Sequence, residues 1–126
     1  MEKRYTDKVS RKLTERLYKA GMQLKVNVDY DLNKYTNMIE RKLDIEPPSY
    51  AKTIDWFMSV GLLIHIYSFP CWRGEECSTE FDVTIHDEKT HEVAHPDPTK
   101  DSFKTWQEAA DYGINNALEV YEAEKD

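Results

Sequence analysis

The residues from His91 to His95 read HEVAH, which matches the HExxH pattern by which many zinc peptidases bind their metal. In those enzymes the pattern lies on a helix, where residues four apart have Cβ atoms about 6 Å apart and both imidazoles reach one ion. On a strand the same two residues lie roughly 13 Å apart and cannot share a metal. The local conformation therefore decides whether HEVAH is a zinc site.

The flanks of HEVAH predict an extended chain. Pro96 follows His95 directly, and the residue before a proline is pushed away from the α region. Residues 87–90 are polar, which is typical of a hairpin turn and supplies no apolar helix face. We therefore expect a return strand from His91 to His95, with no catalytic residue and no metal ligand. A zinc-dependent hydrolase that uses His91, Glu92 and His95 is the alternative from a different class.

Two weaker metal-binding patterns remain. A turn over residues 87–90 would place His86 opposite His91, close enough to pair on an ion, and a one-residue change of register would abolish that arrangement. The sequence leaves open whether these two histidines bind an adventitious metal. Cys71 and Cys77 are separated by five residues, rather than by the two to four that are typical of zinc knuckles. We expect two thiols and no cofactor.

Trp72 and Arg73 are the residues that we predict to bind a partner. They lie between Pro70 and Gly74, in a stretch from Pro70 to Cys77 that we interpret as a loop. Tryptophan and arginine are the residue types most enriched at binding hot spots. The alternative is that the Trp72 ring folds back over an edge of the core. The chain has no GxSxG, Walker or GxGxxG motif, which argues against phosphate-cradling chemistry.

Length and charge restrict the class of protein. A chain of 126 residues, 40% of them hydrophobic, is typical of one folded domain, and we assign residues 1–126 to it. The net charge of −7 repels a phosphate backbone and disfavours nucleic acid as a partner. No apolar run could span a bilayer and the charged N-terminus carries no secretory signal, so we expect a cytoplasmic protein that does not bind membranes. Its partner would be an unknown protein or a second copy in a homodimer.

An α+β fold must position these residues. Capping residues and apolar stripes predict three helices, which begin after Ser10, Ser49 and Thr105. Apolar/polar alternation predicts strands at residues 24–32 and 79–86, the first with Val28 on its buried face. An apolar run at residues 62–69 predicts a central strand that is covered on both faces. Residues 33–46 are left open between a short helix and a return strand. We therefore expect a small antiparallel sheet of about four strands with three helices packed against it.

Three segments of the chain carry a family resemblance: VSRKLTERLYKAG, PPSYAKTIDWFMSVGLLIHIYSF and SFKTWQEAADYGINNALEV. They resemble a family of small uncharacterised proteins found in the genomes, prophages and mobile elements of gut anaerobes. In that family a Ser-capped helix ends in Lys-x-Gly, a Pro-initiated helix leads into a strand, and the last helix starts Ser/Thr-aromatic-x-Glu-Ala. Residues 70–101, HEVAH included, have no counterpart there. The family brings no assigned activity, and small phage-borne domains often act by binding.

These observations favour a non-enzymatic accessory or interaction protein over an enzyme. Its expected contact surfaces are the Trp72–Arg73 loop and the charged outer helices. The zinc-dependent hydrolase is one alternative. An acidic decoy that binds a basic host protein, such as a nucleic-acid-binding protein, is another.

Overall fold

The structure is a computed structural model that describes residues 7–32, 39–94 and 102–125, and for residues 29–32, 39–43, 94 and 125 the backbone alone. Its contacts divide the chain into two compact units, Lys8–Pro48 and a unit of Met1–Asp7 with Ser49–Asp126. A single domain over residues 1–126 stays a prediction. Each unit is described by itself.

The unit of residues 8–48 begins with helix α1 (Arg11–Ala20). As the sequence predicts, the Ser10 hydroxyl oxygen accepts a hydrogen bond from the Leu13 amide (3.2 Å), which caps the first turn. The helix ends at Gly21, whose φ of 107° is a left-handed conformation that glycine adopts without strain. Leu13 and Leu17, on the predicted apolar stripe, are buried.

The rest of this unit is a two-stranded antiparallel ribbon of β1 (Val26–Leu32) and β2 (Ile39–Ile45). Its register pairs Val26 with Ile45 and Leu32 with Ile39. The open question about residues 33–46 is thus answered by a return strand at residues 39–45. The expectation that Val28 lies on a buried face is wrong, because its exposed fraction is 37%. A two-stranded ribbon offers its side chains less cover than the larger sheet that we expected.

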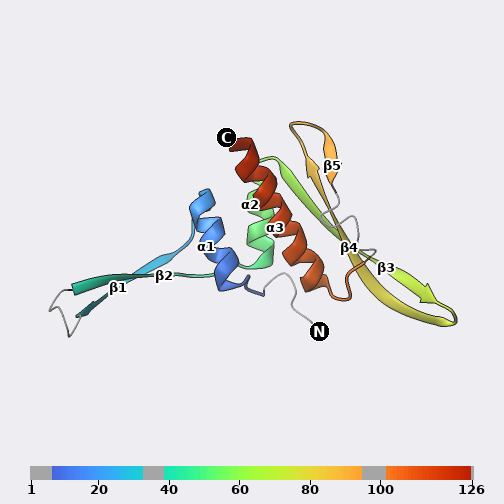
Figure 1. The fold of residues 1–126 in the computed structure, drawn as a ribbon, viewed down its shortest axis with the longest axis horizontal. Helices are drawn as coiled ribbons and strands as arrows, with labels where there is room; N and C mark the ends of the chain where they lie inside the picture. The colour runs from blue at the N-terminus through green and yellow to red at the C-terminus, as the bar shows by residue number, and fades with distance from the viewer. Residues whose placement is uncertain (1–6, 33–38, 95–101, 126) are drawn as a thin grey trace. The chain divides into compact units, whose positions relative to one another are not determined.

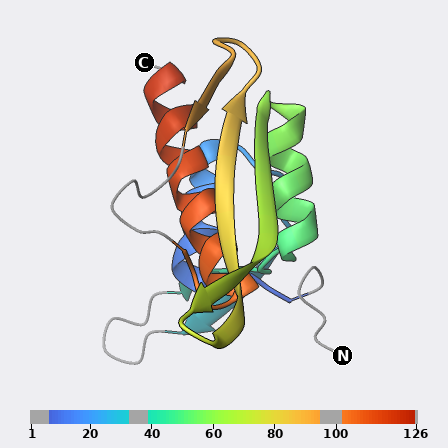
Figure 2. The same cartoon turned by 90° about the vertical axis from the view of Figure 1, so that its right-hand side faces the viewer.

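The second unit holds a three-stranded antiparallel sheet in the order β3-β4-β5, formed by Leu62–Arg73, Glu76–Asp87 and Glu92–Ala94 (Figure 1). Helices α2 (Tyr50–Ser59) and α3 (Trp106–Lys125) both contact this sheet, and Figure 2 looks onto the face that they leave uncovered. The α+β class is therefore confirmed. The described strands form two antiparallel sheets, of two and three strands, so each sheet is smaller than the sheet of about four strands that we expected.

The core of this unit lies between the sheet and the two helices. The covered face of the sheet contributes Leu62, Ile64, Val83 and Ile85, and α2 contributes Phe57. Helix α3 contributes a broad stripe of small and branched residues: Ala109, Ala110, Ile114, Ala117 and Leu118. None of the helices that the structure describes has the length and apolar character that a membrane span needs.

Two expectations about β3 are wrong. It is an edge strand covered on one face, and not a central strand covered on both, because His65 and Tyr67 are exposed. The stretch from Pro70 to Cys77 is also not a loop. Strand β3 continues through Pro70, a residue that edge strands tolerate, and Gly74 (φ 68°) with Glu75 makes the turn into β4.

Candidate functional site

The tip of the β3–β4 hairpin carries both residues that the sequence predicts to bind a partner. We call residues 68–80 the distal hairpin, and Figure 1 shows this part of the ribbon leading away from α2 and α3. Because successive side chains of a strand point to opposite faces, the distal hairpin has two distinct faces. Trp72 lies on one of them and Arg73 on the other, so the two residues do not form one contact point.

The face that includes Trp72 is exposed and free of charge. Trp72 itself is 67% exposed. The register places it beside exposed side chains that are all small or neutral: Ser68, Pro70, Cys77 and Thr79. We call these five residues the Trp72 face. The alternative in which the ring folds back over a core edge is wrong for this chain.

The opposite face is organised around a buried carboxylate. Arg73 Nη2 lies 3.2 Å from Glu80 Oε1 and 3.4 Å from Oε2. The exposed fraction of Glu80 is only 4%. Its oxygens also accept hydrogen bonds from the hydroxyls of Ser102 (2.5 Å) and Ser78 (3.4 Å). Glu80 therefore holds Arg73 in place from within the fold.

Hydrogen bonds keep Glu80 ionised. The Cys71 thiol and the Ser102 hydroxyl, followed by the charge of Arg73, hold the pKa of the Glu80 carboxyl below its ordinary value, against the opposing effect of burial. Such bonds favour the charged form because they replace the water that burial removes. The oxygens of Glu80 are thus occupied by donors of the protein itself.

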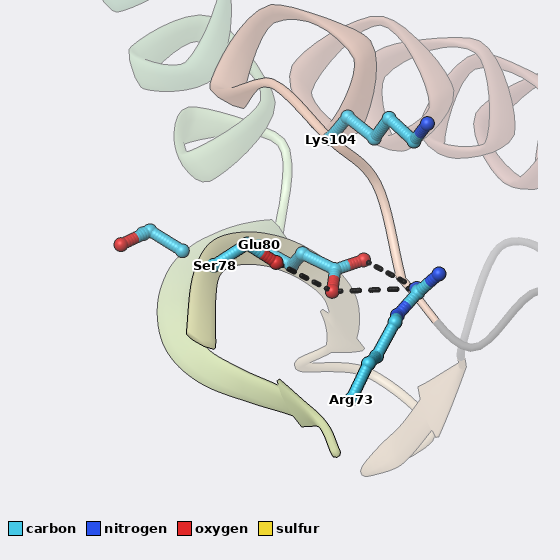
Figure 3. A pocket seen from close by; sticks show the side chains of 5 residues that line it. Arg73, Ser78, Glu80 and Lys104 are labelled. Carbon is cyan, nitrogen blue, oxygen red and sulfur yellow. Dashed lines mark hydrogen bonds and ion pairs between the residues drawn. The ribbon is translucent and has the colours of Figure 1, made fainter. Parts of the chain in front are cut away.

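A cavity of about 340 Å³ lies next to this ion pair (Figure 3). It is lined by Arg73, Ser78, Thr79, Glu80 and Lys104. Lys104 and Ser102 reach the hairpin because Phe103 pairs with Phe81 through two backbone hydrogen bonds, of 2.8 and 2.7 Å. No sequence motif marks Glu80, Ser102 or Lys104 as a residue of this site. The hairpin register puts Arg73 and Glu80 on the same face but pairs Arg73 with Glu76, and no local signal points to a bridge between residues 81 and 103.

The two cysteines lie on opposite faces of the distal hairpin. Cys71 pairs with Ser78, whereas Cys77 pairs with Trp72, so their Cβ atoms point away from each other. Both are free thiols, as the sequence predicts. A disulfide between them within one chain would require the ribbon to open.

HEVAH does not form a helical turn over the part that the structure describes. Glu92–Ala94 forms β5, which confirms the extended conformation for these three residues. His91 lies in the turn before it, with φ 60°, and not in the strand as expected. His95 is outside the described residues. The helix that the zinc-hydrolase alternative requires is therefore absent from residues 91–94.

The predicted pairing of His86 with His91 needs a correction of register. His86 lies opposite Val93, because the turn spans residues 88–91 and is one residue later than expected. The two imidazole rings still approach, with centroids 6.5 Å apart. Within residues 7–32, 39–94 and 102–125, no group of three or more His, Cys, Asp or Glu side chains is placed to hold a metal ion.

No protein-family model matches this chain, and neither the curated proteins nor the solved structures contain a match.

Proposed function

We propose that this protein is a non-enzymatic accessory module that binds another protein through the Trp72 face. The observation that carries the proposal is the 67% exposed fraction of Trp72 at the tip of a hairpin. A tryptophan ring in water loses the favourable free energy of burial, about 25 cal/mol for each Å² of apolar surface that stays exposed. A partner that buries the ring would recover that free energy, which is why tryptophan dominates many binding hot spots.

The charges around the Trp72 face define the chemistry of the partner. Glu75 and Glu76 are exposed at the turn next to Trp72, and the nearby guanidinium of Arg73 is paired with Glu80. The chain as a whole carries a net charge of −7. We therefore infer a partner with an apolar pocket for Trp72 and a rim of Lys or Arg side chains that contacts the two glutamates. An acidic decoy for a basic host protein is one form of this function.

The resemblance to small proteins of prophages and mobile elements supports the same proposal, since such domains often act by binding. The two free thiols fit the reducing cytoplasm, where we propose that the protein works.

The proposal is tested by capture from the native host with tagged wild-type protein and three variants. Trp72→Ala removes the ring, and the double variant Glu75→Lys/Glu76→Lys reverses the charge of the turn. Val93→Ala is the matched control, because Val93 is 65% exposed but lies on β5. A basic protein held by the wild type and by Val93→Ala, but released by the other two, is the expected result.

Affinity measured with the captured protein after purification makes the test quantitative. A hot-spot tryptophan contributes about 2 kcal/mol or more, so Trp72→Ala should weaken binding roughly thirtyfold. Equal binding by Trp72→Ala and wild type would refute the proposal. So would a steady hydrolytic activity that disappears in His91→Ala, together with one equivalent of tightly held zinc, since these results favour the zinc-dependent hydrolase.

We also propose that a second copy of this chain pairs along the free edge of β3. Residues 62–72 contain no Asp, Glu, Lys or Arg, although one third of the chain is charged. Exposed edge strands usually carry charges that prevent pairing with another chain. On the uncovered face His65, Tyr67 and Phe69 form a row of rings that is symmetric about Tyr67. Antiparallel pairing about Tyr67 would place each ring opposite an aromatic ring and would bring no like charges together.

A further inference from the structure

We propose that the cavity beside Arg73 binds a small oxyanion, a carboxylate or a phosphate group, between the side chains of Arg73 and Lys104. This site lies on the face of the distal hairpin opposite Trp72 and goes beyond the protein-binding function proposed above. Figure 3 shows its cationic side chains arriving from two directions: Arg73 from the end of β3 and Lys104 from the segment that leads into α3.

Arg73 is held in place by contacts that use only part of the N–H groups of its guanidinium. Glu80 engages only its Nη2 atom, at 3.2 and 3.4 Å, and the Cys71 sulfur is a further hydrogen-bond partner of the guanidinium. A guanidinium has five N–H groups in a rigid fork. The remaining N–H groups are therefore oriented in advance for a second anion, and binding would cost little conformational entropy.

Lys104 supplies a second positive charge. Its ammonium group makes no ion pair with any residue that the structure describes, and its side chain is exposed along the cavity. It directly precedes Thr105, whose hydroxyl caps α3 by accepting a hydrogen bond from the Glu108 amide (3.1 Å). The positive end of the helix dipole thus lies on the same side as Lys104 and adds to its attraction for an anion.

The balance of donors and acceptors determines the sign of the ligand. Glu80 is the only acid among the described residues that line the cavity, and its oxygens already accept bonds from Arg73, Ser102 and Ser78. Among the described residues a bound cation would find no free carboxylate here, whereas an oxyanion would find N–H groups of Arg73 and the Lys104 ammonium. A volume of about 340 Å³ also suits a small organic acid or phosphate compound.

The experiment is an NMR titration of the full chain with inorganic phosphate and, separately, with acetate, at constant ionic strength set by chloride. We expect saturable shifts of the Ser78, Thr79 and Lys104 amides with at least one of the two anions. A response to phosphate alone assigns a phosphate site, and a response to acetate alone assigns a carboxylate site. The absence of saturable shifts with both anions would overturn the proposal.

Three variants distinguish specific binding in the cavity from a general attraction of the anion to positively charged side chains. Lys104→Gln should weaken binding roughly tenfold, as expected for one charged hydrogen bond. Arg73→Gln should weaken it further, and its amide spectrum shows whether the hairpin has kept its fold. Lys89→Gln is the matched control, because Lys89 is an exposed lysine at another cavity, and it should leave the affinity unchanged. Equal losses in Lys104→Gln and Lys89→Gln would refute the site.

Trp72→Ala makes this test independent of the protein-binding function. It should abolish capture of the partner protein and leave the anion titration unchanged.

Discussion

At the scale of single residues, two carboxyl groups join the end of β4 to the end of α3. Asp87, which is buried, and Glu124 share a hydrogen bond. This bond lowers the pKa of Asp87 and raises the pKa of Glu124, so a single proton is held between them. The Lys89 amide donates a further hydrogen bond to Asp87 Oδ1 (2.9 Å), which favours the ionised form of Asp87.

This pair predicts that the last turn of α3 is most ordered in mildly acidic solution. The raised pKa of Glu124 means that its contribution is present below the ordinary Glu value and is lost as the pH rises through the raised value. The lowered pKa of Asp87 means that its contribution is present above the ordinary Asp value and is lost as the pH falls through the lowered value. Amide hydrogen exchange at residues 121–124 should be measured as a function of pH and corrected for the intrinsic rate. Protection should be greatest at pH values between the lowered pKa of Asp87 and the raised pKa of Glu124.

Glu124→Gln tests the cause of this pH dependence. The amide still donates to Asp87 but cannot ionise, so protection should persist as the pH rises. Glu119→Gln removes an exposed charge from the same helix and should keep the wild-type profile. Identical profiles for wild type and Glu124→Gln would contradict the shared proton.

At the scale of elements, the contact between α3 and the sheet depends on Gly113. A Cβ atom at this position would lie 2.7 Å from Val83 Cγ2 and 3.1 Å from Ile64 Cγ2. Replacing glycine by alanine in a helix normally stabilises it by about 1 kcal/mol, whereas overpacking a core costs about 1–3 kcal/mol. Val83 is fully buried and its branched side chain has little rotamer freedom. The cost of the clash should therefore exceed the gain in helix propensity.

We therefore predict that Gly113→Ala lowers the free energy of unfolding by about 1–2 kcal/mol, measured by urea denaturation. A double-mutant cycle with Val83→Ala, which removes the clashing methyl group, should show that the two losses are less than additive. Stabilisation by Gly113→Ala alone would show that α3 can move away from the sheet.

The elements that local signals specify could be predicted from the sequence, and those that depend on distant partners could not. Ser10, Gly21 and Ser49 mark helix ends through contacts within a few residues. Pro70 and Gly74 are typical of a loop, but the same residues also occur in edge strands and in two-residue turns, which is what the structure shows. The cavity beside Arg73 was missed because it needs Ser102 and Lys104, which only the pairing of Phe103 with Phe81 brings to the hairpin.

At the scale of the whole molecule, the distribution of charge predicts self-association at one place. Because each copy carries a net charge of −7, two copies repel each other except where both present a neutral surface. Residues 62–72 of β3 form such a surface. Light scattering after size-exclusion chromatography should report a dimer at micromolar concentrations.

Tyr67→Lys should give a monomer, because a lysine at the centre of an edge strand opposes pairing with a second copy. Val93→Lys places the same charge on β5, away from the free edge of β3, and should remain dimeric. A wild-type protein that stays monomeric throughout would contradict pairing along β3.

The placement of Cys71 and Cys77 has a practical consequence. Each sulfur reports on a different side of one ribbon: Cys77 sits across from the indole, and Cys71 beside the guanidinium. A fluorophore attached to one, with the other changed to serine, would respond to whatever docks on its own side. Two singly labelled variants of the chain would therefore report the binding of a protein ligand and the binding of a small acid separately.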